Sequence, residues 1–231
     1  MRSHNHKTNF HACFREHRHR MVSMRRTVTT IVFCLATLAI LVGCGRVRYP
    51  QYYTLNLPAP PDPPASENAH ATLAIREFSA PTYLRQGAIA YKTSPEQIAF
   101  YSYHRWATDP REAVTNAVID RLRASGAFAF VKPYDGRPGA SYVLSGRLEK
   151  LDEFDYEGGV KVEIALSAQM TNIATGATVW SNAVSEVGNV NKRDVPAVVS
   201  EMNGTMERAI KELLSPMPAD VATSPAAAKD N

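Results

Sequence analysis

Residues 142–172, with the sequence YVLSGRLEKLDEFDYEGGVKVEIALSAQMTN, decide the fold of this chain. The tight-turn sequence Glu157-Gly158-Gly159 divides them into two long segments, residues 142–156 and 160–172. Apolar and polar side chains alternate along the second segment, which is typical of a strand with one buried face and one face in water. The stretch therefore predicts a long antiparallel hairpin. Its apolar face consists of Val160, Val162, Ile164, Leu166, Ala168 and Met170.

Further strands are expected on both sides of this hairpin. Upstream, residues 72–78, 88–92 and 98–103 have the composition of short strands, and we expect them to form a meander. Residues 128–131 have the composition of another short strand. Downstream, residues 178–186 follow a turn and extend the hairpin to three strands.

Two helices are predicted from their start signals. Asp109-Pro110-Arg111-Glu112 supplies an N-cap acceptor, a proline at the first helical position and a glutamate at the third, and Gly126 is placed to end that helix. Asp194 can cap a second helix that runs to about Leu214. Both segments carry apolar residues at helical spacing. The sequence thus predicts an α+β domain, with a mostly antiparallel sheet and two amphipathic helices packed on one face.

Four acidic residues lie just before the hairpin turn: Asp152, Glu153, Asp155 and Glu157. Such residues could ligate Ca²⁺, but the alternation of a strand sends Asp152 to one face and the others to the opposite face. We therefore favour a solvated hairpin end over a cation site.

A lipoprotein export signal precedes the domain. Arg25 and Arg26 are followed by an apolar run over residues 28–41 and then by Leu41-Val42-Gly43-Cys44. The run is shorter than the roughly twenty residues that cross a bilayer as a helix, so a cleaved leader is favoured over an uncleaved span. Leu41, Val42 and Gly43 form the expected signal-peptidase recognition site. Diacylglycerol and an N-acyl chain are expected on Cys44, and no other cofactor is expected.

The mature chain has a different charge from the precursor. The precursor has 26 basic and 22 acidic residues, of which residues 1–43 hold seven and one, so 19 and 21 remain from Cys44 onward. A nucleic-acid partner suggested by basic charge is therefore excluded. Cys13 and Cys34 lie in the leader, whose true start is Met1, Met21 or Met24.

Acylation sets the expected location. One fatty chain binds a membrane weakly, whereas the three chains of a mature bacterial lipoprotein hold it there permanently. Gly45 follows the lipidated cysteine, and the absence of an aspartate at this position favours the outer membrane over inner-membrane retention. We expect a lipid-anchored protein on the periplasmic face of the outer membrane.

The chain divides into four expected parts. Residues 1–43 are the removed extension and signal peptide, and residues 44–70, which include a proline-rich run, are expected to form a tether. Residues 71–214 form the α+β domain, and residues 215–231, rich in proline and alanine, are expected to be a disordered tail.

Catalytic motifs are scarce in the mature chain. It has no glycine-rich phosphate loop, no His-Glu-x-x-His pair and no Gly-x-Ser-x-Gly elbow, and a lone His104 is a poor candidate for a general base. We therefore expect no enzyme and no metal site. An aromatic cluster has two interpretations: core and strand ends, where tyrosine and tryptophan keep one polar atom in water, or a protein interface, because tyrosine, tryptophan and arginine dominate binding hot spots. We favour the core for Tyr91 and an interface for Arg105-Trp106. The candidate interface residues are Tyr83, Leu84, Arg105 and Trp106.

The order of several short motifs resembles the ABC-type transport auxiliary lipoproteins. The motifs are Tyr52-Tyr53-Thr54-Leu55 after the cysteine, Pro81-Thr82-Tyr83-Leu84 leading to Ile89-Ala90-Tyr91, and Tyr101 leading to Arg105-Trp106-Ala107. The family usually continues Arg-Trp-Ala with Glu-Pro, whereas this chain has Thr108-Asp109-Pro110. The proline still opens the helix, but a partner contact made by that glutamate is in doubt.

The resemblance implies a non-catalytic component of a mammalian-cell-entry-type lipid transporter. Its expected partners are a mammalian-cell-entry-domain protein and the ABC transporter complex, and we expect a homo-oligomer. The alternative is that the domain itself binds acyl chains, in a cleft between the helices and the sheet.

Overall fold

The computed structural model describes residues 26, 29–33, 47–61, 70–155 and 158–217. The chain forms two compact units, residues 1–48 and residues 49–231, and the second holds the fold. None of the helices in the described ranges is both long and apolar enough to cross a membrane. The strands are β1 (Gln51–Tyr53), β2 (Thr72–Ile75), β3 (Ala88–Ser94), β4 (Gln97–Trp106), β5 (Phe130–Pro133), β6 (Tyr142–Phe154), β7 (Lys161–Asn172) and β8 (Thr178–Asn189), and the helices are the 3-10 helix η1 (Thr82–Arg85), α2 (Pro110–Ala124) and α3 (Val195–Leu214).

The predicted hairpin is the centre of the sheet. β6 pairs antiparallel with β7 from Tyr142 opposite Asn172 to Phe154 opposite Lys161, and β7 pairs antiparallel with β8 along most of its length. A register shift lies between Leu148 and Lys150, so the β6 alternation changes phase there. The predicted apolar face of β7 is buried throughout, from Val162 to Met170.

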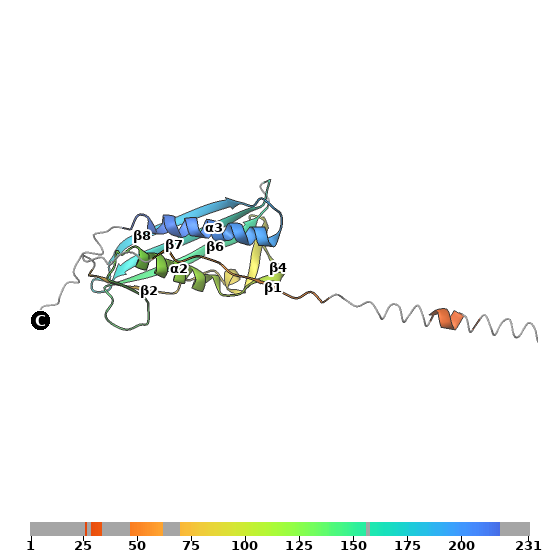
Figure 1. The fold of residues 1–231 in the computed structure, drawn as a ribbon, viewed down its shortest axis with the longest axis horizontal. Coiled ribbons are helices and arrows are strands. Elements are labelled where there is room, and N and C mark those ends of the chain that lie inside the picture. The colour runs from red at the N-terminus through yellow and green to blue at the C-terminus, as the bar shows by residue number, and fades with distance from the viewer. Residues whose placement is uncertain (1–25, 27–28, 34–46, 62–69, 156–157, 218–231) are drawn as a thin grey trace, which may run out of the picture. The chain divides into compact units, whose positions relative to one another are not determined.

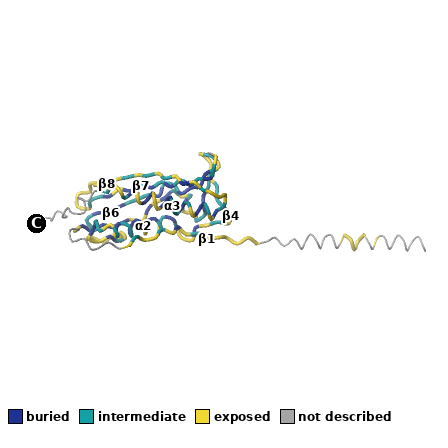
Figure 2. The backbone as a smooth tube through the Cα atoms, turned by 45° about the horizontal axis from the view of Figure 1, so that its top comes forward, coloured by how far each residue is buried: buried dark blue, intermediate teal, exposed yellow. Residues whose placement is uncertain are grey.

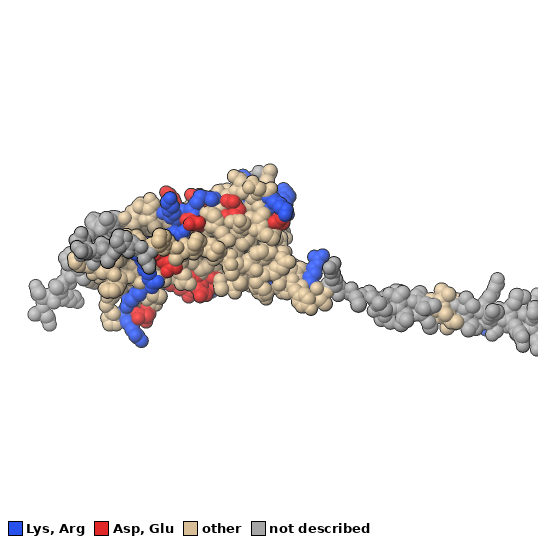
Figure 3. All heavy atoms as spheres, viewed as in Figure 1, with Lys and Arg blue, Asp and Glu red and all other residues tan. Residues whose placement is uncertain are grey.

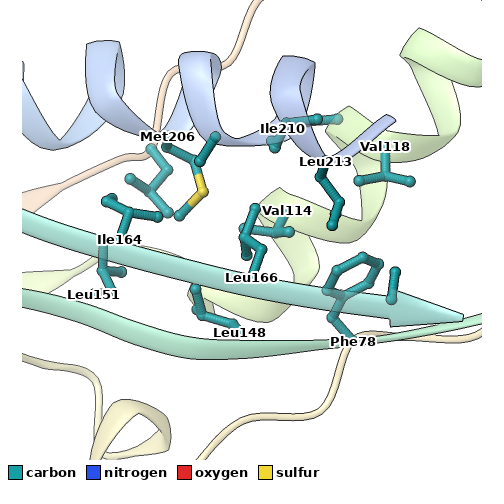
Figure 4. Packing of buried hydrophobic residues seen from close by; sticks show 14 of the residues in the cluster. Phe78, Val114, Val118, Leu148, Leu151, Ile164, Leu166, Met206, Ile210 and Leu213 are labelled. Carbon is teal, nitrogen blue, oxygen red and sulfur yellow. The ribbon is translucent and has the colours of Figure 1, made fainter. Parts of the chain in front are cut away.

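Both helices pack on one face of this sheet, as the sequence predicts (Figure 1). Aliphatic and sulfur-containing side chains fill the core between the helices and the sheet, and Figure 4 shows Met206 and Leu213 of α3 directed towards the strands. A guanidinium nitrogen of Arg121 on α2 lies 3.2 Å from Glu207 on α3, so the helices are neighbours. The α+β class is confirmed. The apolar residues that recur at helical spacing in α3 are all buried: Val195, Val199, Met202, Met206, Ile210 and Leu213.

The start of α2 follows the sequence signal. The Asp109 carboxylate accepts the Arg111 backbone N–H at 2.9 Å, and Pro110 occupies the first turn. Gly126 has φ +65°, the left-handed conformation expected after a helix end. The Thr115 hydroxyl accepts the Phe78 backbone N–H at 3.0 Å and donates to the Arg111 carbonyl, which fixes α2 to the chain after β2.

Asp109→Ala is expected to lower the free energy of unfolding by about 1 kcal/mol at neutral pH, the usual value of an N-cap. The side-chain hydrogen bond from Arg111 holds the pKa of Asp109 below its ordinary value of 3.8. The contribution of Asp109 to the free energy of unfolding is therefore present above pH 3.8 and is lost as the pH falls through the depressed pKa. Urea unfolding at neutral and acidic pH measures this. Asp109→Asn, which keeps a cap acceptor, is the control, and an equal loss in both variants would contradict the capping explanation.

The upstream strands do not form the predicted meander. β2 pairs in parallel with β5 and with the start of β6, whereas β3 pairs antiparallel with β4 and in parallel with the end of β6. The physical reason lies in burial: Leu73, Ala74 and Ile75 of β2 are all buried, as in a strand covered on both faces. The sheet is therefore mixed, with its long ladders antiparallel.

The chain joins the sheet earlier than the predicted tether allows. β1 pairs in parallel with β4, with Gln51 opposite His104 and Tyr53 opposite Trp106, and Leu55 is buried in the core. The proline-rich run after it therefore connects β1 to β2, although residues 62–69 lie outside the described residues. Figure 1 shows β1 and β4 at the end of the domain where α3 starts.

Candidate functional site

The junction of β1 and β4 fixes the N-terminal strand to the domain. The Tyr53 hydroxyl lies 3.0 Å from Nδ1 of His104 and donates to Gln51 at 2.9 Å, and the Ala107 N–H donates to the Tyr53 carbonyl at 2.7 Å. The Asn56 N–H donates to the Asn203 side chain of α3 at 3.1 Å. Residues 53–56 are therefore bonded both to β4 and to α3.

A cluster of aromatic rings lies beside this junction. The Tyr101 ring packs against Tyr91 with centroids 4.8 Å apart and meets His104 edge-on at 5.6 Å. The cluster forms because β4 carries extra residues here: Ala88 is opposite Arg105, but Ala90 is already opposite Phe100. This irregularity turns the Tyr101 side chain towards β6.

Two carboxylates of β6 complete the site, and both are buried. Asp152, 1 % exposed, forms an ion pair with Lys92 Nζ at 2.9 Å and accepts the Tyr83 hydroxyl at 3.2 Å. Glu153, 7 % exposed, accepts the Tyr101 hydroxyl at 2.8 Å. Burial raises the pKa of Glu153, and burial followed by the neighbouring carboxylates raises the pKa of both tyrosines.

This burial corrects the prediction of a solvated hairpin end for Asp152 and Glu153. The sequence could not show that η1, β3 and β4 cover the end of β6 on both sides. Asp155 is half-buried and lies 3.6 Å from Arg193, whereas Glu157 lies outside the described residues. Adjacent strand residues point to opposite faces, so Asp152 and Glu153 cannot act together as an acid–base pair. Within the described ranges, no three acidic, histidine or cysteine side chains are grouped as metal ligands.

Glu153→Gln is expected to flatten the pH dependence of stability. Burial raises the pKa of Glu153 in the folded protein. The contribution of Glu153 to the free energy of unfolding is therefore fully present below the ordinary pKa of 4.5 and is lost as the pH rises through the raised pKa. The variant keeps an acceptor for Tyr101 and removes the titration. Urea unfolding from pH 4 to 8 measures the slope. Exposed Glu96 provides the control substitution Glu96→Gln, and an unchanged slope in Glu153→Gln would contradict the argument.

The four predicted interface residues are in different environments. Leu84 and Trp106, 2 % and 6 % exposed, belong to the core, which corrects their assignment to a surface. Tyr83 is half-buried against Asp152, and Arg105 is exposed. Aromatic and arginine residues occur in both cores and interfaces, so composition alone could not separate these cases. Leu41, Val42, Gly43 and Cys44 lie outside the described residues.

The helix–sheet interface is filled by side chains. Met202, Met206, Ile210 and Leu213 have no exposed area, and their partners on β7 are equally buried. Two hollows, of about 620 and 530 Å³, are lined by strand and loop residues and by none from α2 or α3. The first lies across β6, β7 and β8 and is lined by small polar residues such as Ser145, Ser167 and Ser181.

The surface charges are mixed in sign. Figure 3 shows lysine and arginine close to aspartate and glutamate over the visible face, without a large area of one sign. On the sheet, charges of opposite sign are also paired, as in Arg147 with Glu149 and Lys150 with Glu163, each at 2.8 Å. The described residues on this face therefore form no basic stripe of the kind found in nucleic-acid-binding proteins.

The sequence profile of the family described as ABC-type transport auxiliary lipoprotein component matches residues 53–213. The chain belongs to this family. The match begins at the last residue of β1 and ends in the last turn of α3, so it covers the fold from the end of β1 onward. The family is an auxiliary part of ABC-type transport and consists of lipoproteins, which indicates a membrane-anchored location in the cell envelope. No curated protein matches the chain.

Solved structures share the fold at low identity. A protein from Xanthomonas campestris is 18 % identical with a TM-score of 0.61, covering 71 % of this chain and 92 % of its own. An uncharacterized protein is 16 % identical with a TM-score of 0.57, covering 74 % and 99 %. PelC from Paraburkholderia phytofirmans, a dodecamer, is 19 % identical over 68 % of this chain and 93 % of its own, with a TM-score of 0.41. The first two support the fold alone.

Proposed function

We propose that the protein is a non-catalytic docking component of a mammalian-cell-entry-type lipid transport system. It is anchored through acylated Cys44 to the periplasmic face of the outer membrane, where it holds the periplasmic part of the transporter. The observation that carries the proposal is the pairing of β1 with β4 only a few residues after the cysteine. This arrangement joins a membrane anchor to a rigid domain.

The non-catalytic role is supported by the arrangement of the polar groups. The two buried carboxylates point to opposite faces. Asp152 contacts Lys92 and Tyr83, and Glu153 accepts a hydrogen bond from Tyr101. His104 contacts Tyr53 and Tyr101, and among the described residues no serine or cysteine is recorded in contact with it. These contacts hold strands together, which is what a docking domain requires.

A homo-oligomer is part of the proposal. In the described sheet β8 pairs with β7 alone, which leaves one edge of a long strand without a partner strand. Its exposed positions include Ser181, Ala183, Ser185 and Val187, and no proline or lysine interrupts the strand. Natural proteins usually protect such an edge, so an unprotected one is suited to pairing with another chain.

Affinity purification from gently solubilised envelopes tests the proposal. The bait is the full-length protein with a C-terminal tag, cross-linked in the cell before extraction. We expect a protein with mammalian-cell-entry domains, together with the permease and ATPase subunits. The Cys44→Ala form, which lacks the anchor, is the comparison bait. Recovery of unrelated envelope proteins alone would contradict the proposal.

A further inference from the structure

The tether between the lipid and the fold is short. Six residues separate Cys44 from Gln51, where β1 begins. Even a fully extended chain of this length spans only about 25 Å. The domain therefore stays close to the lipid headgroups if Cys44 is acylated, and the link from Cys44 enters it at the end that contains β1.

The exposed face of this end carries tyrosines and an arginine. Tyr52 pairs with Arg105, and strand alternation places both opposite to the inward-facing Tyr53 and Trp106. Tyr103 lies two residues before Arg105 on β4 and is exposed like it. Tyr52 is 64 % exposed and Tyr103 43 %. We call Tyr52, Tyr103 and Arg105 the tyrosine face. Figure 2 shows the described residues that lead into β1 as exposed, before the chain becomes buried inside the domain.

We propose that the tyrosine face lies against the phospholipid surface and sets the orientation of the domain on the membrane. This rests on the proposed anchor at Cys44. Tyrosine has an apolar ring and a polar hydroxyl, which suits it to the headgroup region, and Arg105 adds a cation for lipid phosphates. The β1–β4 pairing and the Tyr53–His104 contact hold β1, with Tyr52, firmly against β4, with Arg105.

Site-directed fluorescence quenching tests this inference on the acylated protein. The mature chain has no thiol other than acylated Cys44, so Tyr52→Cys supplies one labelling site for an environment-sensitive dye. The probe membrane is a vesicle of phosphatidylethanolamine with a minority of phosphatidylglycerol, spin-labelled near the headgroups. We expect a blue shift and strong quenching for dyes at position 52 and, in Tyr103→Cys, at position 103.

Ile173→Cys is the matched control. Ile173 is 50 % exposed, and its N–H bonds to the Ser141 carbonyl just before β6 starts. Glu153, which bonds Tyr101, lies near the other end of β6, roughly 35 Å away along the strand. A dye at position 173 should therefore remain unquenched. Arg105→Glu should reduce the quenching at position 52.

The possible results test the orientation of the domain separately from its acyl anchor. Flotation with the vesicles and the mass of the N-terminal peptide report acylation alone. If the protein floats but the dye at position 52 is no more quenched than the dye at 173, the inference is overturned and the anchor stands. Protection of position 52 without lipid quenching, through a second copy or a partner protein, would also overturn it. A protein that neither floats nor carries acyl chains contradicts the proposed function itself.

Discussion

Gly146→Ala is expected to lower the free energy of unfolding by roughly 3 kcal/mol, near the upper end of the usual cost of overpacking a core. A Cβ at this position would meet three carbons of the Phe78 ring well inside 3.0 Å, a distance that real Cβ atoms do not reach. The Phe78 ring has no exposed area, and Figure 4 shows it on the helix side of the strands. Neither partner can move without disturbing the core.

The ring is held from several directions. The Phe78 N–H donates to Thr115 of α2, and the Ser79 N–H donates to the Gly146 carbonyl at 2.9 Å. The backbone on both sides of the contact is therefore fixed. Urea unfolding followed by circular dichroism measures the loss as a shift in midpoint at an unchanged slope.

Two further variants make this test specific. Gly159→Ala is the matched control, because no atom lies within 4 Å of a Cβ built there, and its stability should change by less than about 0.5 kcal/mol. The double variant Gly146→Ala/Phe78→Leu lacks the clashing ring. It should recover part of the free energy of unfolding that Gly146→Ala loses, since the contact couples the two sites. Strictly additive effects would contradict a direct clash.

Local signals predicted the secondary structure well because each depends on few neighbours. Asp109 and Asp194 cap their helices through bonds within three residues, and the hairpin follows from alternation and a glycine turn. The pairing of strands far apart in the sequence could not be predicted from such local signals. β2 and β6 are brought together by burial of Leu73 and Leu144, and nothing near either residue specifies that parallel contact.

The site was harder to predict than the fold. The strand character of residues 52–55 was visible, but the proline run after them suggested a tether, and only the pairing with β4 shows that they are part of the sheet. Glu153 is charged and lies near a turn, so the sequence predicted exposure. A phase change at Leu148 and the irregular β4 bring Tyr101 over it instead.

Cys44→Ala is expected to move essentially all of the protein from the membrane to the soluble periplasmic fraction. Acyl chains contribute about 0.8 kcal/mol for each buried methylene, so loss of three chains removes far more free energy than Tyr52 and Tyr103 can supply. The folded domain itself should survive, because its first described core residue, Leu55, lies well after the cysteine. Carbonate extraction and flotation measure the redistribution, and circular dichroism verifies the fold.

Cys34→Ala provides a control that leaves the anchoring chemistry intact. Cys34 lies within the apolar run of the expected leader, so its loss should change neither processing nor membrane association. Alanine preserves an apolar run, which is all that this part of the leader requires. A protein that remains in the membrane fraction after Cys44→Ala, or that leaves it after Cys34→Ala, would show that something other than acylated Cys44 provides the attachment. The short link to β1 would then no longer bring the tyrosine face to the lipid.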